Sequence, residues 1–507
     1  RYREAKFDVN EDGEFTTKLE LITYTVEGTV KDAYTDKPLA DVKVAVGDVT
    51  TKTDANGKYS AVVMAQSGSV SWQIEGYVAA RQPYGGSQQL DVKLRPSTLA
   101  GIVTDSKSGQ PIGGATVTLG EQVAKADDSG RYALHDVPEQ ANLVVKAAGY
   151  EAAKVAVDRK TEQDVKLDPF VVRAAYLTYY GVGDDGLRNN VIDLIDSTEL
   201  NAVVIDIKGD FGKIAYKSDV PLAQAIEADA EPTIPDIEGL LRTLKEKGIY
   251  TIARIVVFKD DMLGRNGPAA GVDVAVRNAS TGGPWIDGEN LVWVDPFREE
   301  VWDYNTALAV EAAKKGFDEI QFDYIRFPTD PSPGSSVNAA VFSDVSNEAN
   351  RTTAIVSFLS RARTALQKVG ANLSVDVFGY TCWREDDMGI GQNIEQIAKY
   401  VDYISPMVYP STYSDGLPME PNYMDAPAYP YEIVYYSIER AVERLGDSPT
   451  KIRPWLQYFD DYPWASGREY NAPQIEAQKQ ASVEAGGYGF LLWDPTNRFS
   501  RGGLEPE

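Results

Sequence analysis

The chain has 507 residues, of which 43% are hydrophobic, and carries a formal net charge of −26 at neutral pH. This length suits about three domains, and this hydrophobic fraction is enough for packed cores. The acidic charge argues against nucleic acid and anionic membrane as partners, because like charges repel. Membrane insertion is not expected either, since no apolar run approaches the ~20 residues of a spanning helix.

Histidine and cysteine each occur once, at His135 and Cys382. An internal disulfide is therefore impossible. The C-terminal half of the chain contains no imidazole, which argues against Ser-His-Asp hydrolysis and His-ligated zinc and leaves carboxylate chemistry without a cofactor. The chain starts at Arg1 without a signal peptide, so we expect an exported protein, secreted or at the cell surface, whose leader was removed.

Residues 1–23 form an N-terminal arm that we expect to be rich in β-structure. Asp8, Asn10 and Asp12 have the spacing that opens a calcium loop, but the closing acid would fall at Leu19, which favours a plain turn. The arm can pair with its own domain or, by strand addition, with a neighbouring molecule. A homo-oligomer or polymer assembled through the arm is therefore one open expectation.

The next 145 residues or so contain an internal repeat. GTVKDAYTDKPLADVKV starts at Gly28 and GIVTDSKSGQPIGGATV at Gly101, 73 residues later. The same offset superposes TDANGKYS on ADDSGRYA, EGYVAA on AGYEAA and DVKLRP on DVKLDP. Four blocks that share one offset indicate a tandem duplication.

Each repeat unit alternates short β-rich runs with Asp, Asn and Gly turns. This pattern predicts two antiparallel β-sandwiches, Ig-like or prealbumin-like, at residues 24–97 and 98–170. The G-x-V-x-D opening, the D-x-x-G-x-Y turn and the closing G-Y resemble carboxypeptidase regulatory-like domains. The resemblance implies spacer or adhesion modules.

Residues 171–507 have a different texture, in which β-branched runs alternate with helix-period segments of 10–20 residues. Eight candidate strands lie near Ala174, Val203, Ile252, Ile320, Val375, Ile404, Trp455 and Leu491. Candidate helices between them include Ile237–Lys247, Arg298–Lys315, Arg351–Lys368, Ile433–Leu445 and Ala472–Glu484. The pattern predicts a (β/α)₈ TIM barrel. A doubly wound open sheet is the alternative, although the chain lacks its glycine-rich phosphate loop.

The expected strand ends carry carboxylates. Side chains alternate along a strand, so Asp206 and Lys208 are predicted to share an inward face on the second strand. Asp323 points inward on the fourth strand, Asp376 on the fifth and Gln457 on the seventh. Since the active site of such a barrel lies at the C-terminal ends of the strands, three carboxylates are expected to converge there.

Two interpretations of this cluster stay open. One is an internal salt-bridge network in which Asp206, Lys208, Asp323 and Arg326 neutralise one another. The other is a sugar-binding mouth, because aromatic rings stack on the apolar faces of sugars. The aromatic candidates are Tyr179, Tyr180, Phe211, Trp285, Trp293, Trp383, Tyr409, Tyr413, Trp455, Trp464 and Trp493.

Five ordered motifs carry a family resemblance. They are QFDYIRFP at Gln321–Pro328, DVFGY at Asp376–Tyr380, IGQN at Ile390–Asn393, ISPMVYPS at Ile404–Ser411 and RPWLQ at Arg453–Gln457. In these motifs the chain resembles a family of bacterial glycoside hydrolase (β/α)₈ barrels related to α-glycosidases. The resemblance implies hydrolysis of an α-linked polysaccharide or cell-surface glycan.

The resemblance also implies residue roles. Asp323 would be the nucleophile and Asp376 the acid/base, with Glu385 as a reserve acid. Arg326 would keep Asp323 ionised. The remaining substrate-binding candidates are Asp206, Lys208, Trp383, Tyr409, Trp455, Gln457 and Trp493.

Two positions depart from the family pattern. Relatives place a histidine after ISPMVYPS, where this chain has Thr412, and an acid after RPWLQ, where it has Tyr458. These departures keep two alternatives to hydrolysis open. One is a surface or filament structural protein that uses the barrel as a scaffold and the N-terminal arm for strand exchange. The other is a carbohydrate-binding protein without catalysis.

Overall fold

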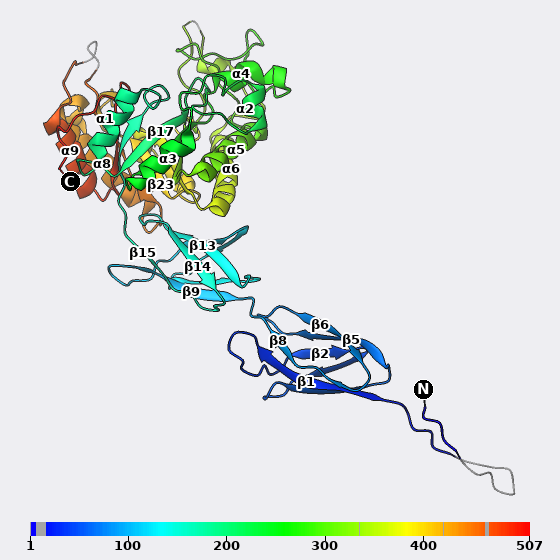
Figure 1. Ribbon diagram of the computed structural model, residues 1–507. Coiled ribbons are helices and arrows are strands. Elements are labelled where there is room, and N and C mark those ends of the chain that lie inside the picture. Colours follow the sequence, from blue (N-terminus) through cyan, green and yellow to red (C-terminus); the bar gives the residue numbers. More distant parts are fainter. Residues whose placement is uncertain (1, 7–16, 334, 419, 462–465, 507) are drawn as a thin grey trace.

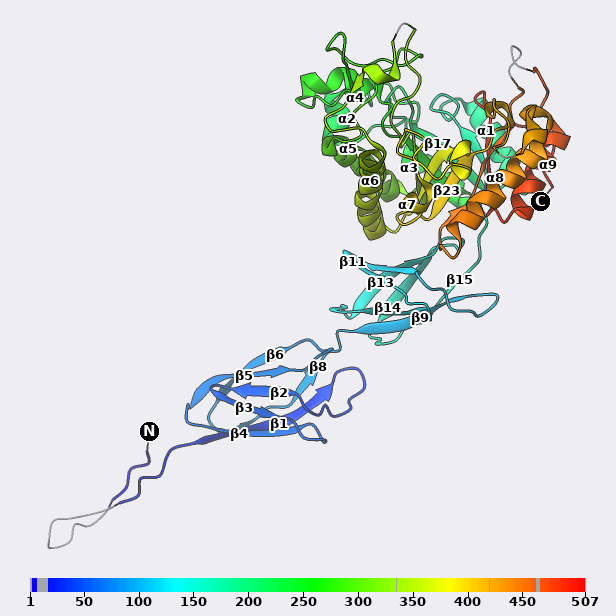
Figure 2. The same cartoon turned by 180° about the vertical axis from the view of Figure 1, so that it is seen from behind.

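The computed structural model describes residues 2–6, 17–333, 335–418, 420–461 and 466–506. Two β-sandwiches and a barrel follow one another in a row, and the N-terminal arm lies at the far end from the barrel (Figure 1). The view from behind shows the same order (Figure 2). The predicted fold class, tandem β-domains followed by a TIM barrel, is confirmed.

The described ends of the N-terminal arm pair with each other. Tyr2 and Leu21 form an antiparallel bridge, and the Arg3 N–H donates to the Glu20 carbonyl oxygen at 2.8 Å. Tyr2 and Leu21 are exposed. The calcium-loop candidates Asp8, Asn10 and Asp12 lie outside the described residues.

The first sandwich packs two sheets around Val44 and Trp72. Its strands are β1 (Tyr24–Asp32), β2 (Lys43–Val46), β3 (Val49–Lys52), β4 (Lys58–Val63), β5 (Ser67–Gln73), β6 (Ala80–Gly85), β7 (Gln88–Gln89) and β8 (Val92–Leu94). One sheet has the order β3-β2-β5-β6, and the other pairs β1 with β4, β7 and β8. The expectation of a purely antiparallel sandwich is wrong, since the chain crosses over before β7 and β8, which run parallel to β1.

The second sandwich repeats the strands of the first, except that the short β7 has no counterpart. Its strands are β9 (Leu99–Asp105), β10 (Thr116–Leu119), β11 (Gln122–Lys125), β12 (Arg131–Leu134), β13 (Gln140–Lys146), β14 (Ala153–Asp158) and β15 (Val165–Leu167). The bounds of β2, β3, β5, β6 and β8 recur 73 residues later in β10, β11, β13, β14 and β15. This correspondence supports the duplication seen in the sequence.

Both sandwiches end in the same hydrogen bond. The Ser97 N–H donates to the Gly76 carbonyl oxygen at 2.8 Å, and 73 residues later the Phe170 N–H donates to the Gly149 carbonyl oxygen at 2.9 Å. Both glycines have left-handed backbones, with φ of 80° and 88°, which favour glycine over other residues.

The barrel is a closed parallel sheet. Its eight strands are β16 (Arg173–Leu177), β17 (Ala202–Lys208), β18 (Tyr250–Val256), β20 (Glu319–Asp323), β22 (Asn372–Phe378), β23 (Tyr403–Met407), β25 (Trp455–Gln457) and β26 (Phe490–Trp493). The short β24 (Lys451–Ile452) also pairs with β23, and β19 (Arg277–Asn278) pairs with β21 (Ala340–Val341) among the loops. Because β26 pairs with β16, the sheet closes and the doubly wound alternative is wrong.

Helices surround the barrel (Figures 1 and 2). They are α1 (Asp185–Ile195), α2 (Pro221–Ala225), α3 (Ile237–Glu246), α4 (Asp261–Asn266), α5 (Glu299–Lys315), α6 (Glu348–Val369), α7 (Ile394–Ile397), α8 (Pro430–Leu445) and α9 (Ala472–Glu484). Local sequence explains their ends: Asn347 caps α6 by accepting from the Asn350 N–H, and Gly370 ends it with a left-handed backbone. In the part of the chain that the structure describes, no helix is long and apolar enough to cross a membrane.

The second sandwich docks on the end of the barrel where the strands begin. The Gly149 N–H donates to the Tyr403 hydroxyl at 2.8 Å, and the Tyr488 hydroxyl donates to the Gly149 carbonyl oxygen at 2.8 Å. Lys146 enters the interface almost fully buried, donates to the Ala371 carbonyl oxygen and lies 3.8 Å from an Asp402 carboxylate oxygen. The strand ends that carry the predicted site therefore face away from the sandwiches.

Candidate active site

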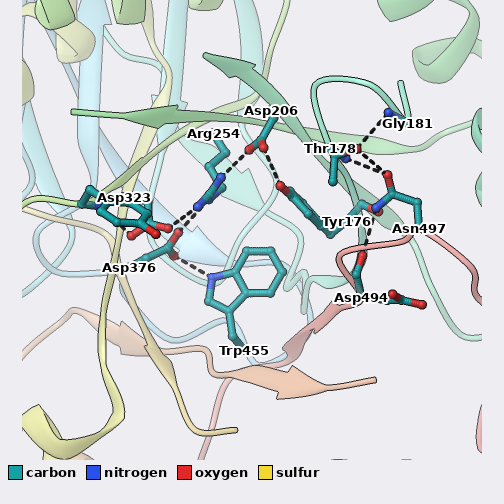
Figure 3. Close-up of polar contacts among 11 residues, drawn as sticks. Tyr176, Thr178, Gly181, Asp206, Arg254, Asp323, Asp376, Trp455, Asp494 and Asn497 are labelled. Carbon is teal, nitrogen blue, oxygen red and sulfur yellow. Dashed lines mark hydrogen bonds and ion pairs between the residues drawn. The ribbon is translucent and has the colours of Figure 1, made fainter. Parts of the chain in front are cut away.

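Arg254, on β18 between β17 and β20, joins the three carboxylates that were expected to converge. Its guanidinium donates to Asp206 Oδ1 at 2.5 Å and to Asp323 Oδ2, and its Nε lies 3.5 Å from Asp376 Oδ2 (Figure 3). Burial disfavours the charged form, but the neighbouring Asp206 and Asp323 outweigh it and raise the pKa of Arg254 well above its ordinary value. The site is thus built around a permanent cation.

Asp206 binds Arg254 through one oxygen and a tyrosine through the other. The Tyr176 hydroxyl donates to Asp206 Oδ2 (Figure 3). Burial raises the pKa of Asp206 above its ordinary value, although Arg254 and Tyr176 both oppose this shift. Asp206 therefore holds a proton more readily than an exposed aspartate does.

Tyr176 is positioned by Asn497, which the sequence interpretation missed. Asn497 Nδ2 donates to the Tyr176 carbonyl oxygen at 3.1 Å, while its Oδ1 accepts from the Thr178 N–H and hydroxyl (Figure 3). The Tyr176 ring stacks on Trp493 with centroids 4.1 Å apart. These contacts fix the end of β16 and aim the tyrosine hydroxyl at Asp206.

Asp323 is the last residue of β20, and a strained turn follows it. Tyr324 has a φ of 51°, a left-handed backbone that is rare for a bulky residue. Its N–H donates to Asp323 Oδ1 at 2.5 Å, while Arg254 binds the other oxygen. Each oxygen of the Asp323 carboxylate therefore accepts a hydrogen bond, one from the backbone and one from Arg254.

Asp376 lies beneath this pair, with no exposed surface. Trp455 Nε1 donates to its Oδ1 at 2.7 Å, but its Oδ2 has no hydrogen-bond partner among the described residues. Burial and the neighbouring Asp323 raise the pKa of Asp376 well above its ordinary value. The protonated form of Asp376 is therefore favoured.

Two cavities open around Arg254. The Asp323 cavity, of about 200 Å³, is lined by Arg254, Asp323, Tyr324, Arg326, Phe378, Gln392, Met407, Tyr409, Thr412, Trp455, Phe459 and Trp493. The Asp206 cavity, of about 250 Å³, is lined by Tyr176, Thr178, Tyr179, Tyr180, Asp206, Gly209, Asp210, Phe211, Lys213, Arg254, Val256, Tyr324 and Trp493. Arg254, Tyr324 and Trp493 belong to both, so the cavities adjoin. Together they fall in the size range of ligand pockets, about 300–1,000 Å³.

A family model covers nearly the whole barrel. Residues 174–499 match the model of the family described as "Putative glycosyl hydrolase domain". The chain belongs to this family. Residues 98–169, just before the glycosyl hydrolase domain, match the carboxypeptidase regulatory-like domain. A search of curated protein sequences found no match.

Three solved structures illustrate what the chain is similar to, and the first of them matches less than half of this chain. A hypothetical protein from Ruminiclostridium thermocellum is 38% identical, with coverage of 40% of this chain and 97% of that chain and a TM-score of 0.34. The glycoside hydrolase domain of PgaB (BpsB) from Bordetella bronchiseptica is 15% identical, with coverage of 65% and 95% and a TM-score of 0.44. The α-galactosidase TtGalA from Thermus thermophilus is 13% identical, with coverage of 87% and 79% and a TM-score of 0.39.

Within the glycosyl hydrolase domain, Lys208 does not lie where the sequence interpretation placed it. A register shift between Asp206 and Lys208 turns the lysine to the other side of the sheet. There Lys208 is fully buried, pairs with Asp260 Oδ2 at 2.7 Å and donates to Asn305 on α5 at 3.0 Å. The predicted shared face of Asp206 and Lys208 is wrong, and Lys208 lines neither cavity.

Arg326 and Gln457 also differ from expectation. Arg326 lines the Asp323 cavity but makes no ion pair with Asp323, whose cationic partner is Arg254. The predicted salt-bridge network around Asp206 and Asp323 exists, but its cation is Arg254 rather than Lys208 or Arg326. Gln457 is fully buried, and its amide is occupied by Ser411 and the Phe459 carbonyl oxygen. Gln457 lines neither cavity, so this arrangement does not place it as a substrate-binding residue.

The remaining candidates divide into two groups. Tyr409, Trp455 and Trp493 line the Asp323 cavity, as the stacking role requires. Trp383 instead packs beside α8, where its Nε1 donates to Ser437 at 3.0 Å, and Glu385 is an exposed residue outside both cavities.

The three carboxylates surround the side chain of Arg254. In the described ranges, no group of three or more acidic, histidine or cysteine side chains is arranged to hold a metal ion. The space between Asp206, Asp323 and Asp376 is filled by the Arg254 guanidinium.

Proposed function

We propose that this chain is an exported glycoside hydrolase that cleaves an O-glycosidic bond in a polysaccharide. The observation that carries the proposal is the pairing of two carboxyl groups with different surroundings, Asp323 and Asp206, on adjoining aromatic cavities. Glycoside hydrolysis needs one ionised and one protonated carboxyl group. The motifs shared with α-glycosidase-like barrels favour an α-linked substrate.

Asp323 is the ionised carboxylate of this proposal. It lines its cavity and is held by Arg254 and the Tyr324 N–H, both of which favour negative charge. In this position it acts on the anomeric carbon directly or through a water molecule.

The proton donor requires a choice between two carboxyl groups. The family resemblance gives this role to Asp376, which has a raised pKa but lines neither cavity and is not exposed. Asp206 has a raised pKa and lines a cavity. We therefore assign proton donation to Asp206, and to Asp376 the role of a neutral positioning residue beneath Arg254.

Asparagine variants test the assignment, because asparagine resembles a protonated aspartate but cannot transfer its proton. A general acid contributes about 10²–10⁴-fold to the rate. Asp206→Asn should lose this factor on a polysaccharide yet retain turnover of an aryl glycoside whose leaving group needs no proton. Asp323→Asn should lose both activities, and Asp376→Asn should keep most of both.

The outcomes separate the alternatives. If Asp376→Asn shows the aryl-glycoside pattern and Asp206→Asn does not, Asp376 is the acid after all. Undiminished hydrolysis by Asp323→Asn, with unchanged circular dichroism, would sink the catalytic assignment.

A second candidate, carbohydrate binding without catalysis, is favoured by one observation. Arg254 already binds Asp206 and Asp323, as in a purely structural ion-pair network. This candidate predicts glycan binding by the wild-type chain with no cleavage of any glycan in a broad panel.

A further inference from the structure

We propose that Arg326 binds the carboxylate of an acidic sugar in the Asp323 cavity, so that the preferred substrate is a glycan containing uronic acid. This inference rests on the proposed hydrolase function and names its substrate class. It is carried by a buried cation that lines the cavity and forms no ion pair with any carboxylate in the described part of the chain.

Arg326 is 6% exposed and forms no ion pair with any described carboxylate. Its Nη1 donates to the Phe327 carbonyl oxygen at 3.2 Å and to the Thr329 hydroxyl at 3.0 Å. Asp330 accepts from Thr329 rather than from the guanidinium. The Nε and Nη2 groups donate to no described residue, which leaves one edge of the guanidinium free.

Three aromatic rings fix the orientation of this edge. The guanidinium carbon lies 4.8 Å from the ring centre of Trp293, 5.1 Å from that of Tyr324 and 4.7 Å from that of Phe378. Rings attract the faces of a guanidinium, whereas its N–H groups radiate from its edge. The cage therefore holds the cation while the free edge stays available to a ligand.

The other buried cations near the mouth all have anionic partners. Arg254 pairs with Asp206 and Asp323, and Lys259 lies 2.9 Å from Glu289 Oε2. Burial lowers the pKa of Arg326 and costs free energy, although Tyr324, Asp330 and Asp323 nearby oppose the shift without forming an ion pair. A ligand carboxylate would supply the missing charge, and its two oxygens match two parallel N–H groups of a guanidinium.

The cavity offers further donors beside Arg326. Gln392 accepts from the Phe378 N–H through its Oε1, which leaves its amide NH₂ for a ligand. Burial keeps Tyr409 protonated by raising its pKa well above the ordinary value. Since Asp323 lines the same cavity of about 200 Å³, one sugar ring can face the catalytic carboxylate and the cation together.

The test measures binding of monosaccharides, which needs no hydrolysis. Glucuronate and galacturonate are titrated against glucose and galactose, with tryptophan fluorescence as the readout because Trp455 and Trp493 line the cavity. We expect at least one uronate to bind about 10-fold more tightly than its neutral counterpart, which corresponds to one charge-assisted interaction.

Variants locate the effect. Arg326→Met should abolish the preference for the uronate, and Arg326→Lys, which keeps the charge but not the paired donors, should weaken it. Arg384→Met is the matched control, because it removes an equal charge from an exposed arginine that pairs with Asp386. Arg384→Met should keep the preference.

Several results would overturn the inference: no detectable uronate binding, a preference that survives in Arg326→Met, or tighter binding of a sugar sulfate or phosphate than of the uronate. Failure of the inference and of the proposed function remain distinct. Cleavage of neutral glycans that is unaffected by Arg326→Met overturns only the inference. A uronate preference that depends on Arg326, without cleavage of any glycan, overturns only the hydrolase.

Discussion

Replacement of Arg254 by methionine removes the cation that compensates the buried carboxylates. Arg254 is 5% exposed, and its partners Asp206 and Asp323 are each 5% exposed, so solvent cannot replace the lost charge. Breaking a buried ion pair by removing one partner costs about 3–5 kcal/mol. At about 2 °C per kcal/mol for a domain of this size, the Tm of the barrel should fall by about 6–10 °C at pH 7.5.

The pH dependence of this loss is the sharper part of the prediction. Without Arg254, which opposes the effect of burial, the pKa of Asp206 in the folded state should rise further above that in the unfolded state. Such groups contribute stability that is fully present below the unfolded pKa, near 4, and is lost as pH rises through the folded pKa. The difference in Tm between wild type and Arg254→Met should therefore shrink from pH 7.5 to pH 4.5.

Thermal unfolding followed by circular dichroism at the two pH values provides the assay, with Arg384→Met as the control for one lost surface charge. A Tm difference of the same size at both pH values would refute the electrostatic reasoning. If Arg254→Met is as stable as wild type at pH 7.5, loss of the cation does not leave two buried carboxylates at a cost in stability.

Two more variants probe the surroundings. Tyr176→Phe removes a hydrogen bond that lowers the pKa of Asp206, so the alkaline limb of the pH–activity profile should move to higher pH; an unmoved limb would contradict proton donation by Asp206. Burial lowers the pKa of Lys146 to about 8 in the folded chain, below its unfolded value, so wild-type stability should rise between pH 8 and 10. The rise in the free energy of unfolding, measured by urea denaturation, should reach up to about 3 kcal/mol in the wild type and be absent in Lys146→Met. If the free energy of unfolding changes with pH equally in both proteins, Lys146 is not a buried amine with a lowered pKa.

Much of the fold could be predicted because local pattern and tertiary environment agree. All seven residues of β17 are buried, and its sequence AVVIDIK is an apolar run interrupted only by residues with buried polar partners. Parallel barrel strands are covered on both faces, so such runs are a strong signal. The repeat offset in the sandwiches required no structural knowledge at all.

The site was less predictable, for reasons that differ by residue. Arg254 carried a usable signal, since a charged side chain within YTIARIVV had to face either the helices or the barrel interior beside Asp206. Lys208 carried none, because the bulge that turns it away depends on the pairing with β18. Alternation correctly turned Asp376 inward but could not reveal its hydrogen bond to Trp455, which lies on β25, two strands away from β22 in the barrel.

The backbone hydrogen bond accepted by Gly76, and by Gly149 in the second sandwich, suggests how proteins with more or fewer sandwiches could be built. In each case the chain leaves one sandwich through the same hydrogen bond, whether the next body is another sandwich or the barrel. A third sandwich inserted at this point could form the same backbone hydrogen bond at its junction as the two existing sandwiches do. The number of sandwiches between the N-terminal arm and the barrel therefore sets how far apart these two parts of the molecule lie (Figure 1).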